Sequence, residues 1–214
     1  YPGIRMIKNI PLSLFRNQQT ESAKPFTRFL ELASSAIIIV ALLYSSARLS
    51  YDATGMYFSN AKLIALSERI QYFFDFLLVS SLHIGIQYAA LIKIFGDQAA
   101  RMYSWIGGIV TLVFSLALGE KLGLSRKALT LLQVMILTST VFVDLLGDGK
   151  IDLQTSAPML AAIYWMVADK QINLGRGVYF LIGLLAGFSI ISRLFNAFLA
   201  LLFIGLFYLW RLYS

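Results

Sequence analysis

Residues 143–165 read VDLLGDGKIDLQTSAPMLAAIYW and hold the most informative pattern of the chain. Three carboxylates (Asp144, Asp148 and Asp152) and Lys150 lie within nine residues, between two runs that are apolar enough to lie in lipid. Charged residues are costly at a membrane boundary, and they mark either a water-exposed turn or a polar site. Asp52 also follows an apolar run, so both acidic positions are candidates for one polar site.

The composition of the 214 residues predicts an integral membrane protein. Hydrophobic residues make up 58% of the chain and charged residues 14%, whereas soluble domains carry about 25% charged residues. The net charge of +7 fits anionic lipid headgroups better than nucleic acid, which we do not expect as a partner. The absence of cysteine excludes disulfides and thiolate metal sites. We interpret the chain, which starts at Tyr1, as part of a longer polytopic protein.

The hydropathy pattern predicts an all-α bundle of about six membrane-spanning helices with an additional interfacial helical segment. The last apolar run is too long for one helix, and Ser192-Arg193 in its middle predicts two short helices that meet at Arg193. Gly175, Gly177, Gly183 and Gly187 predict close helix packing in the same region. The apolar runs are 33–47, 73–95, 104–118, 128–147, 156–168 and 177–211.

The basic residues predict the orientation, because loops rich in Lys and Arg stay in the cytoplasm. Residues 1–32 form a basic cytoplasmic segment, and residues 33–214 form the transmembrane module. The loops at 119–127 and 169–176 are also basic and are expected inside, which sends Asp52 and the acidic loop at 144–155 outside. Two full crossings between Asp52 and residue 119 would contradict this order. Residues 48–98 are therefore expected to form a non-cytoplasmic loop or interfacial segment, in which 60–96 does not cross the membrane.

Each polar position also has a simpler interpretation. The stretch from Asp144 resembles a calcium-binding loop, but Leu146 and Thr155 stand where two ligands are needed. A polar turn and a site facing a cavity both remain open for this stretch. Asp52 can equally end one helix and cap the next. His83 is the only histidine, so we predict a packed or hydrogen-bonded side chain and no metal site.

The order of four short motifs resembles the GT-C superfamily of polytopic glycosyltransferases, which use sugars linked to polyprenyl phosphate. The similarity extends over roughly residues 34–200, and the Asp-Glu pair frequent in the family is Asp-Ala here. The motifs are SYDATGMYFSNAKL (50–63), IFGDQAARMYSW (94–105), GKIDLQTSAPMLAAIYW (149–165) and GLLAGFSIISRLFNAF (183–198).

The resemblance implies transfer of a sugar from a polyprenyl-phosphate carrier to an acceptor on the non-cytoplasmic side. It implies that Asp52 is the general base, and that Asp152 stands nearby to hold the acceptor, the base or a divalent cation. Lys62, Arg69 or Arg193 would neutralise the leaving phosphate. Membrane lipids and the lipid-linked donor are the partners this interpretation requires, with other membrane subunits as further candidates.

A different class of function remains open at this point. The chain could be a non-catalytic transmembrane subunit of a larger membrane complex, with the same positions buried against neighbours or lipid. An enzyme requires Asp52 and Asp152 to share one aqueous face, with a basic group within reach. A transporter fragment is ranked last, because the runs at 33–47 and 104–118 offer almost no polar residues near mid-membrane.

Overall fold

The computed structural model describes residues 29, 32–40, 57–70, 82–148, 150–172, 176–193 and 195–213. These residues are all-helical and include no strand, which confirms the predicted fold class. Asp52 and most of the basic segment 1–32 lie outside the described residues. Residues 32–40 are helical, and the later helices are α4 (Ser59–Ser67), α6 (Leu82–Phe95), α7 (Asp97–Lys121), α8 (Arg126–Thr138), α9 (Thr140–Asp148), α10 (Asp152–Ile172), α11 (Arg176–Ser192) and α12 (Phe195–Tyr213).

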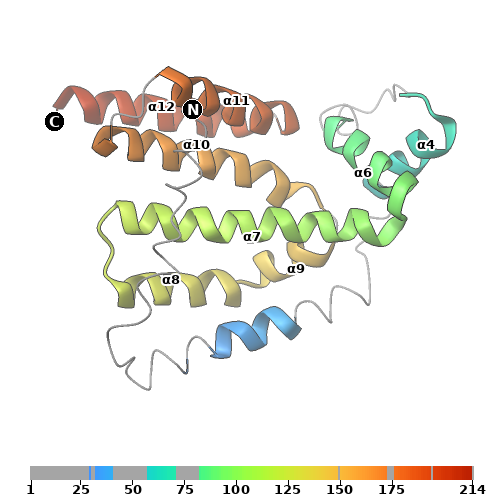
Figure 1. The fold of residues 1–214 in the computed structure, drawn as a ribbon, viewed down its shortest axis with the longest axis horizontal. Coiled ribbons are helices and arrows are strands. Elements are labelled where there is room, and N and C mark those ends of the chain that lie inside the picture. Colours follow the sequence, from blue (N-terminus) through green and yellow to red (C-terminus); the bar gives the residue numbers. More distant parts are fainter. Residues whose placement is uncertain are drawn as a thin grey trace.

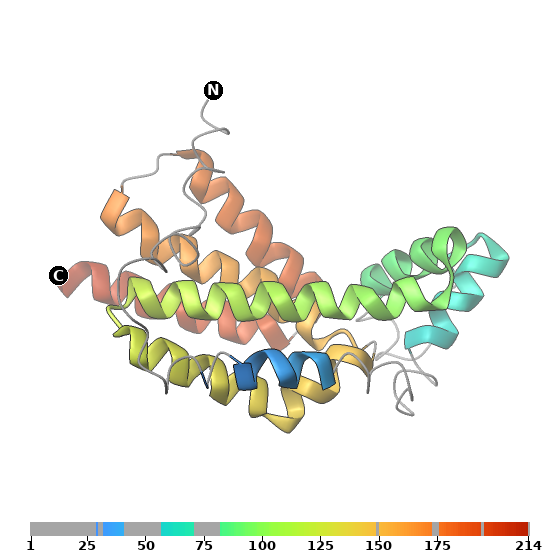
Figure 2. The ribbon, with the colours of Figure 1, turned by 60° about the horizontal axis from the view of Figure 1, so that its bottom comes forward.

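The helix α7 forms the long axis of a bundle in which successive elements run back and forth (Figure 1). On one side α7 packs against α10, which in turn contacts α11 and α12, and on the other side it packs against α8 and α9. The pair α4 and α6 lies at the beginning of α7, a position that Figure 2 shows from a second direction. We call the end of the bundle with Asp97, Asp152 and Arg193 the Asp152 end. The opposite end, where α7 and α10 end and α8 and α11 begin, is the Lys121 end.

Local sequence explains where α7 and α8 begin and end. Gly96 and Gly123 have positive φ angles of 82° and 85°, a backbone conformation that glycine adopts without strain. Gly96 separates α6 from α7, and Gly123 lies in the turn that follows α7. The Ser125 hydroxyl then caps α8 by accepting the Ala128 N–H at 3.3 Å. These turns reverse the chain and return α8 along α7.

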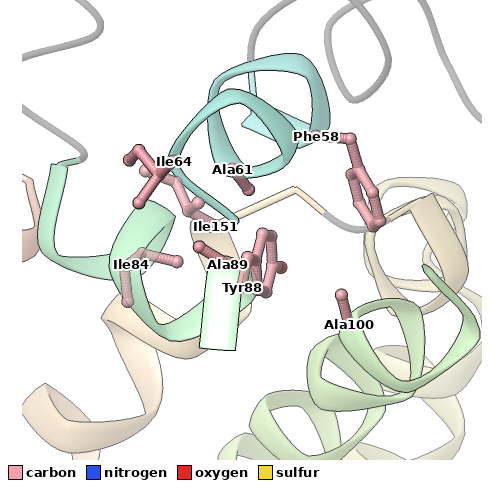
Figure 3. Packing of buried hydrophobic residues seen from close by; sticks show 8 residues of the cluster. All are labelled: Phe58, Ala61, Ile64, Ile84, Tyr88, Ala89, Ala100 and Ile151. Atoms are coloured by element: carbon pink, nitrogen blue, oxygen red, sulfur yellow. The ribbon is translucent and has the colours of Figure 1, made fainter. Parts of the chain in front are cut away.

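A buried cluster at the Asp152 end fixes the start of α10 (Figure 3). Phe58 and Ile64 from the α4 region meet Ile84 and Tyr88 from α6. Ile151, which directly precedes α10, belongs to the same cluster. Burial of apolar surface therefore anchors the residue before Asp152 against α4 and α6.

Helices pack closely at Gly107 and Gly108 of α7. A Cβ at Gly107 would lie 2.9 Å from the backbone nitrogen of Gln154, and one at Gly108 would lie 2.1 Å from Leu146 Cδ2. The predicted close packing at the glycines of α11 is wrong where it can be examined. A Cβ at Gly177, Gly183 or Gly187 would meet nothing within 4 Å, and Gly175 lies outside the described residues. Those glycines lie on surface that no described helix covers.

The number of membrane-spanning helices is less clear than predicted. Among the described helices, α7 alone is long and apolar enough to cross a membrane. The pair α8 and α9 passes the same test only when taken together, and it is bent by 65° at Ser139. Shorter apolar helices cover His83–Phe95, which belongs to the segment predicted not to cross, Arg176–Ser192 and Asn196–Leu206. The predicted total of about six spans is thus not established by helix length.

The segment predicted not to cross the membrane contains helix in its described parts, 60–70 and 82–96. Lys62 of α4 forms an ion pair with Asp97 at the start of α7. Lys93 of α6 pairs with Glu68, which follows α4. These pairs join α4 to the start of α7 and the end of α6 to the residue that follows α4.

Candidate functional site

An ion pair between Asp152 and Arg193 lies where three helices meet. Asp152 is the first residue of α10, and Arg193 occupies the break between α11 and α12. The predicted helix junction at Arg193 is therefore confirmed. The side chains of Asp152 and Arg193 are 24% and 43% exposed, so both remain accessible to solvent or a ligand.

Backbone hydrogen bonds hold Arg193 in the break. Its N–H donates to the carbonyls of Ser189 (3.1 Å) and Ile190 (3.2 Å), and its own carbonyl accepts the Asn196 N–H at 2.9 Å. Backbone hydrogen bonds therefore continue through the turn, although the regular helix α11 ends at Ser192. Because the backbone is fixed, the guanidinium projects from a defined position beside Asp152.

A buried polar cluster supports this junction from behind. The Ser189 hydroxyl donates to the Thr155 carbonyl at 2.5 Å. The Asn196 amide donates to the Ser189 hydroxyl at 2.8 Å and to the Ser189 carbonyl at 3.2 Å. All three residues are buried. These contacts join α10, α11 and α12 one turn away from the ion pair.

His83 connects α6 to the residue that precedes Arg193. Its Nε2 lies 2.7 Å from the hydroxyl of Ser192, and its ring packs edge-on against Phe188 at a centroid distance of 5.0 Å. The Ser192 hydroxyl donates its proton to the Phe188 carbonyl at 2.6 Å, so the imidazole Nε2–H donates to Ser192. This confirms the prediction of a packed, hydrogen-bonded histidine. Ser192 is fully buried, and its hydroxyl is therefore a structural group here and cannot attack a substrate.

Helix α9 carries the other two carboxylates of the opening motif, Asp144 and Asp148. Helix α9 continues through Asp148, so Asp144 lies on a helix and the loop of a calcium site is not formed. Lys150 pairs with Asp148 at 3.3 Å. Among the described residues, no group of three or more His, Asp or Glu side chains gathers to hold a metal ion. The acidic stretch is thus a helix end and a turn closed by an ion pair.

Gln154 ties this turn to α6 and α7. Its side chain lies 2.8 Å from the Tyr88 hydroxyl. With the amide oxygen facing Tyr88 and the Ser104 N–H, the NH2 group donates to the Lys150 carbonyl at 2.7 Å, which satisfies every group. We adopt this orientation, because it leaves no buried acceptor facing another acceptor. The backbone of the turn is then fixed next to Asp152.

The structure brings together two of the five predicted site residues. Asp152 and Arg193 are in contact, whereas Lys62 pairs with Asp97 and Arg69 follows the end of α4. The predicted meeting of Asp52 with Asp152 lies outside the described residues. Ser189, Ser192 and Asn196 were not predicted to form a group. The signal that could have found them is their spacing of three and four residues, on the helix face next to Arg193, in a run that is otherwise apolar apart from this arginine.

The arrangement at the Asp152 end suits recognition of an anion more than acid–base chemistry on its own. A half-exposed guanidinium presents several N–H donors in a fixed plane, which matches the oxygens of a phosphate. Asp152 holds that plane in place and can accept a hydrogen bond from a hydroxyl.

Comparison of the chain with family models, curated proteins and solved structures found no match.

Proposed function

We propose that the chain is the transmembrane module of a GT-C-type glycosyltransferase, which transfers a sugar from a polyprenyl-phosphate carrier on the non-cytoplasmic side. In this proposal the helix of residues 32–40, α7, the α8–α9 pair, α10, α11 and α12 cross the bilayer. The segment with α4 and α6 lies at the non-cytoplasmic surface. The Asp152 end faces outward, and the Lys121 end faces the cytoplasm.

The distribution of charge supports this orientation. At the Asp152 end acidic and basic residues occur together, as in the pairs Lys62–Asp97, Lys93–Glu68, Lys150–Asp148 and Arg193–Asp152. The loop 119–127 at the Lys121 end carries Lys121, Arg126 and Lys127 against Glu120. An excess of Lys and Arg in short loops is typical of the cytoplasmic side.

The exposed apolar side chains support a position in lipid. Large hydrophobic residues with more than half of their surface exposed occur on α7, α8, α11 and α12. Such faces are unusual on a protein surrounded by water. Examples are Met102, Leu131, Phe180, Ile191 and Phe198.

The contact between Asp152 and Arg193 is the observation that carries the proposed chemistry. Two positions that the resemblance assigns to one site, 41 residues apart in sequence, meet where α10 begins and where α11 ends. In the proposed reaction Arg193 binds the donor phosphate and stabilises the charge that develops on it. Asp152 orients Arg193 and the acceptor, or holds a divalent cation. Asp52 acts as the general base, and Lys62 or Arg69 adds positive charge at the same end.

The test is sugar transfer from a labelled polyprenyl-phosphate donor by the complete protein in membranes. We expect Arg193→Gln to lower the transfer rate by about 100-fold or more, because a charged donor to the transition state is lost. Asp152→Asn is expected to have a similar effect, with unchanged abundance of the protein. Glu68→Gln is the matched control, because Glu68 is another paired acid at this end. Normal transfer by both Arg193→Gln and Asp152→Asn would contradict the proposal.

A second function, that of a non-catalytic membrane subunit, is favoured by a different feature. Asp152 is already paired with Arg193. In this second function the pair has a single role, which is to hold α10 against the junction of α11 and α12. The exposed apolar residues of α11 and α12 would then contact neighbouring subunits. In that case the ion pair stabilises the fold, and it does not matter for any reaction which of the two positions carries the positive charge.

A further inference from the structure

An apolar cavity of about 290 Å³ lies on the side of α7 that faces away from α10. Its wall is formed by α7, α8, α9 and the helix of residues 32–40, whose neighbourhood Figures 1 and 2 both show. The buried side chains of Trp105, Leu137 and Phe142 line its inner part. Met102 and Ile109, which are largely exposed, line its mouth. The lining presents no polar surface.

The cavity requires an apolar occupant. Water enters a cavity only where polar partners are present, and a cavity of about 150 Å³ lined by aliphatic and aromatic side chains stays dry and binds benzene. The present cavity is larger, and it lies beside the break at Ser139, where α8 and α9 diverge by 65° and where Leu137 and Phe142 line it on either side. A hydrocarbon group would restore the contacts that the bend removes.

The mouth of the cavity indicates where that group comes from. Met102, Ile106 and Ile109 lie at helical spacing on α7 and form an exposed apolar strip continuous with the mouth. Under the proposed function this strip faces bilayer lipid. A hydrocarbon chain can therefore enter sideways from the membrane without passing through water.

The cavity is closed toward the Asp152–Arg193 pair. Gly107 lets the backbone of α10 approach α7 so closely that a Cβ would lie 2.9 Å from Gln154 N. The adjacent Gly108 is covered by Leu146 and Leu153. No chain can pass between α7 and α10 at this level, so the occupant is separate from a donor whose phosphate contacts Arg193.

We propose that this cavity binds one acyl chain of a bilayer phospholipid and that the bound chain stabilises the α8–α9 break. The inference rests on the membrane position in the proposed function, but not on the sugar-transfer reaction. The phospholipid is a structural lipid on the face opposite the ion pair. Its headgroup stays in the bilayer surface, and its chain replaces side chains that the bent helix pair does not supply.

Trp105 provides the probe for a test. In a chain with Trp165→Phe and Trp210→Phe, Trp105 is the remaining tryptophan of the three. The protein is reconstituted in phosphatidylcholine vesicles that carry bromine atoms in the middle of one acyl chain, since bromine quenches tryptophan on contact. We expect loss of most of the Trp105 fluorescence relative to vesicles without bromine.

Two variants of that chain separate entry into the cavity from ordinary contact with lipid. Ile109→Phe places a ring at the mouth and should restore the Trp105 fluorescence. Leu131→Phe is the matched control, because Leu131 is 57% exposed against 55% for Ile109 but does not line the cavity. Quenching that persists in Ile109→Phe at the level of the control would overturn the proposal.

A third chain distinguishes failure of this proposal from failure of the membrane position. Phe180→Trp, with all three native tryptophans replaced by Phe, reports contact of the exposed face of α11 with lipid. Quenching at position 180 without quenching of Trp105 overturns the acyl-chain site and leaves the membrane position standing. Absence of quenching at both positions overturns both. If a brominated polyprenyl phosphate quenches Trp105 and the brominated phospholipid does not, the occupant is the donor and the proposal is wrong.

Discussion

Single polar residues explain why the long apolar run 177–211 breaks where it does. The break after Ser192 removes helix partners from the last carbonyls of α11. The Arg193 N–H donates to the carbonyls of Ser189 and Ile190, and the Asn196 amide gives the Ser189 carbonyl a second donor. Asn196 also donates to the buried hydroxyl of Ser189, a polar group that is costly to bury without partners.

The first prediction concerns this amide. Asn196→Ala should lower the free energy of unfolding by about 1–3 kcal/mol, because the buried Ser189 hydroxyl loses the hydrogen bond that it accepts from Asn196. Phe198→Ala is the control on the same helix, since Phe198 is largely exposed, and it should have a smaller effect. Denaturant titration of the protein in detergent measures both. Equal stability of Asn196→Ala and the wild type would show that the amide is dispensable.

The second prediction concerns pH. The Glu68 carboxylate accepts a hydrogen bond from Lys93, and this contact lowers the pKa of Glu68 below its usual value of 4.5. A carboxyl group whose pKa is lower in the folded state than in the unfolded state stabilises the folded protein at pH values above its pKa in the unfolded state. This stabilisation is lost as the pH falls through its pKa in the folded state. Wild type should thus be more stable than Glu68→Gln at neutral pH in low salt, and this difference should become smaller at acidic pH, below the usual pKa of 4.5. Thermal unfolding at both pH values tests this, and a constant difference would contradict it.

Helix elements pack closely only where small residues face a partner. Gly107 and Gly108 meet the start of α10, whereas Gly183 and Gly187 of α11 face open space. The sequence shows the same residue type at both places. It cannot show which helix face finds a neighbour, and this is why the prediction for α11 was wrong.

The third prediction compares two glycines. Gly107→Ala should destabilise the protein by about 1–3 kcal/mol, because its Cβ would push against the backbone of α10, which cannot rotate away. Gly183→Ala has free space and should stabilise α11 by up to about 1 kcal/mol through higher helix propensity. Thermal stability of the two variants measures the difference. Similar values for both would mean that α7 and α10 are not in close contact.

The predictions that the structure confirms rest on features that are local in the sequence. The helix content follows from long apolar runs, and the junction at Arg193 follows from a charge that an unbroken apolar helix would expose to lipid. The break at Ser139 was not predicted, because Thr138, Ser139 and Thr140 form no strong helix-breaking signal. The contact of His83 with Ser192 joins residues 109 positions apart and depends on tertiary packing alone.

At the scale of the whole molecule, the order of the helices determines which residues share one end. Because α7, the α8–α9 pair, α10 and α11 alternate in direction (Figure 1), Asp152 at the start of α10 meets Arg193 at the end of α11. The last residues of α7 and α10 and the first residues of α8 and α11 lie toward the other end for the same reason. This alternation agrees with the order of acidic and basic loops in the sequence.

The fourth prediction tests the orientation. The chain has no cysteine, so a single introduced thiol can be labelled without background. Phe95→Cys and Leu122→Cys replace exposed residues beside the two ends of α7. In intact cells a membrane-impermeant maleimide should label the Phe95→Cys variant, and it should label Leu122→Cys only after permeabilisation. Labelling of both variants in intact cells would exclude a spanning α7, and the reverse pattern would invert the topology.

The most direct test of the proposed enzyme is exchange of the charges of the ion pair, measured as sugar transfer by the complete protein. Asp152→Arg alone places two cations together and should reduce folded protein, whereas Asp152→Arg combined with Arg193→Asp should restore it. Transfer should remain lost in the double variant, because a carboxylate at position 193 repels the donor phosphate. Recovery of transfer together with folded protein would show that the pair only joins the helices, and would contradict its role in the reaction.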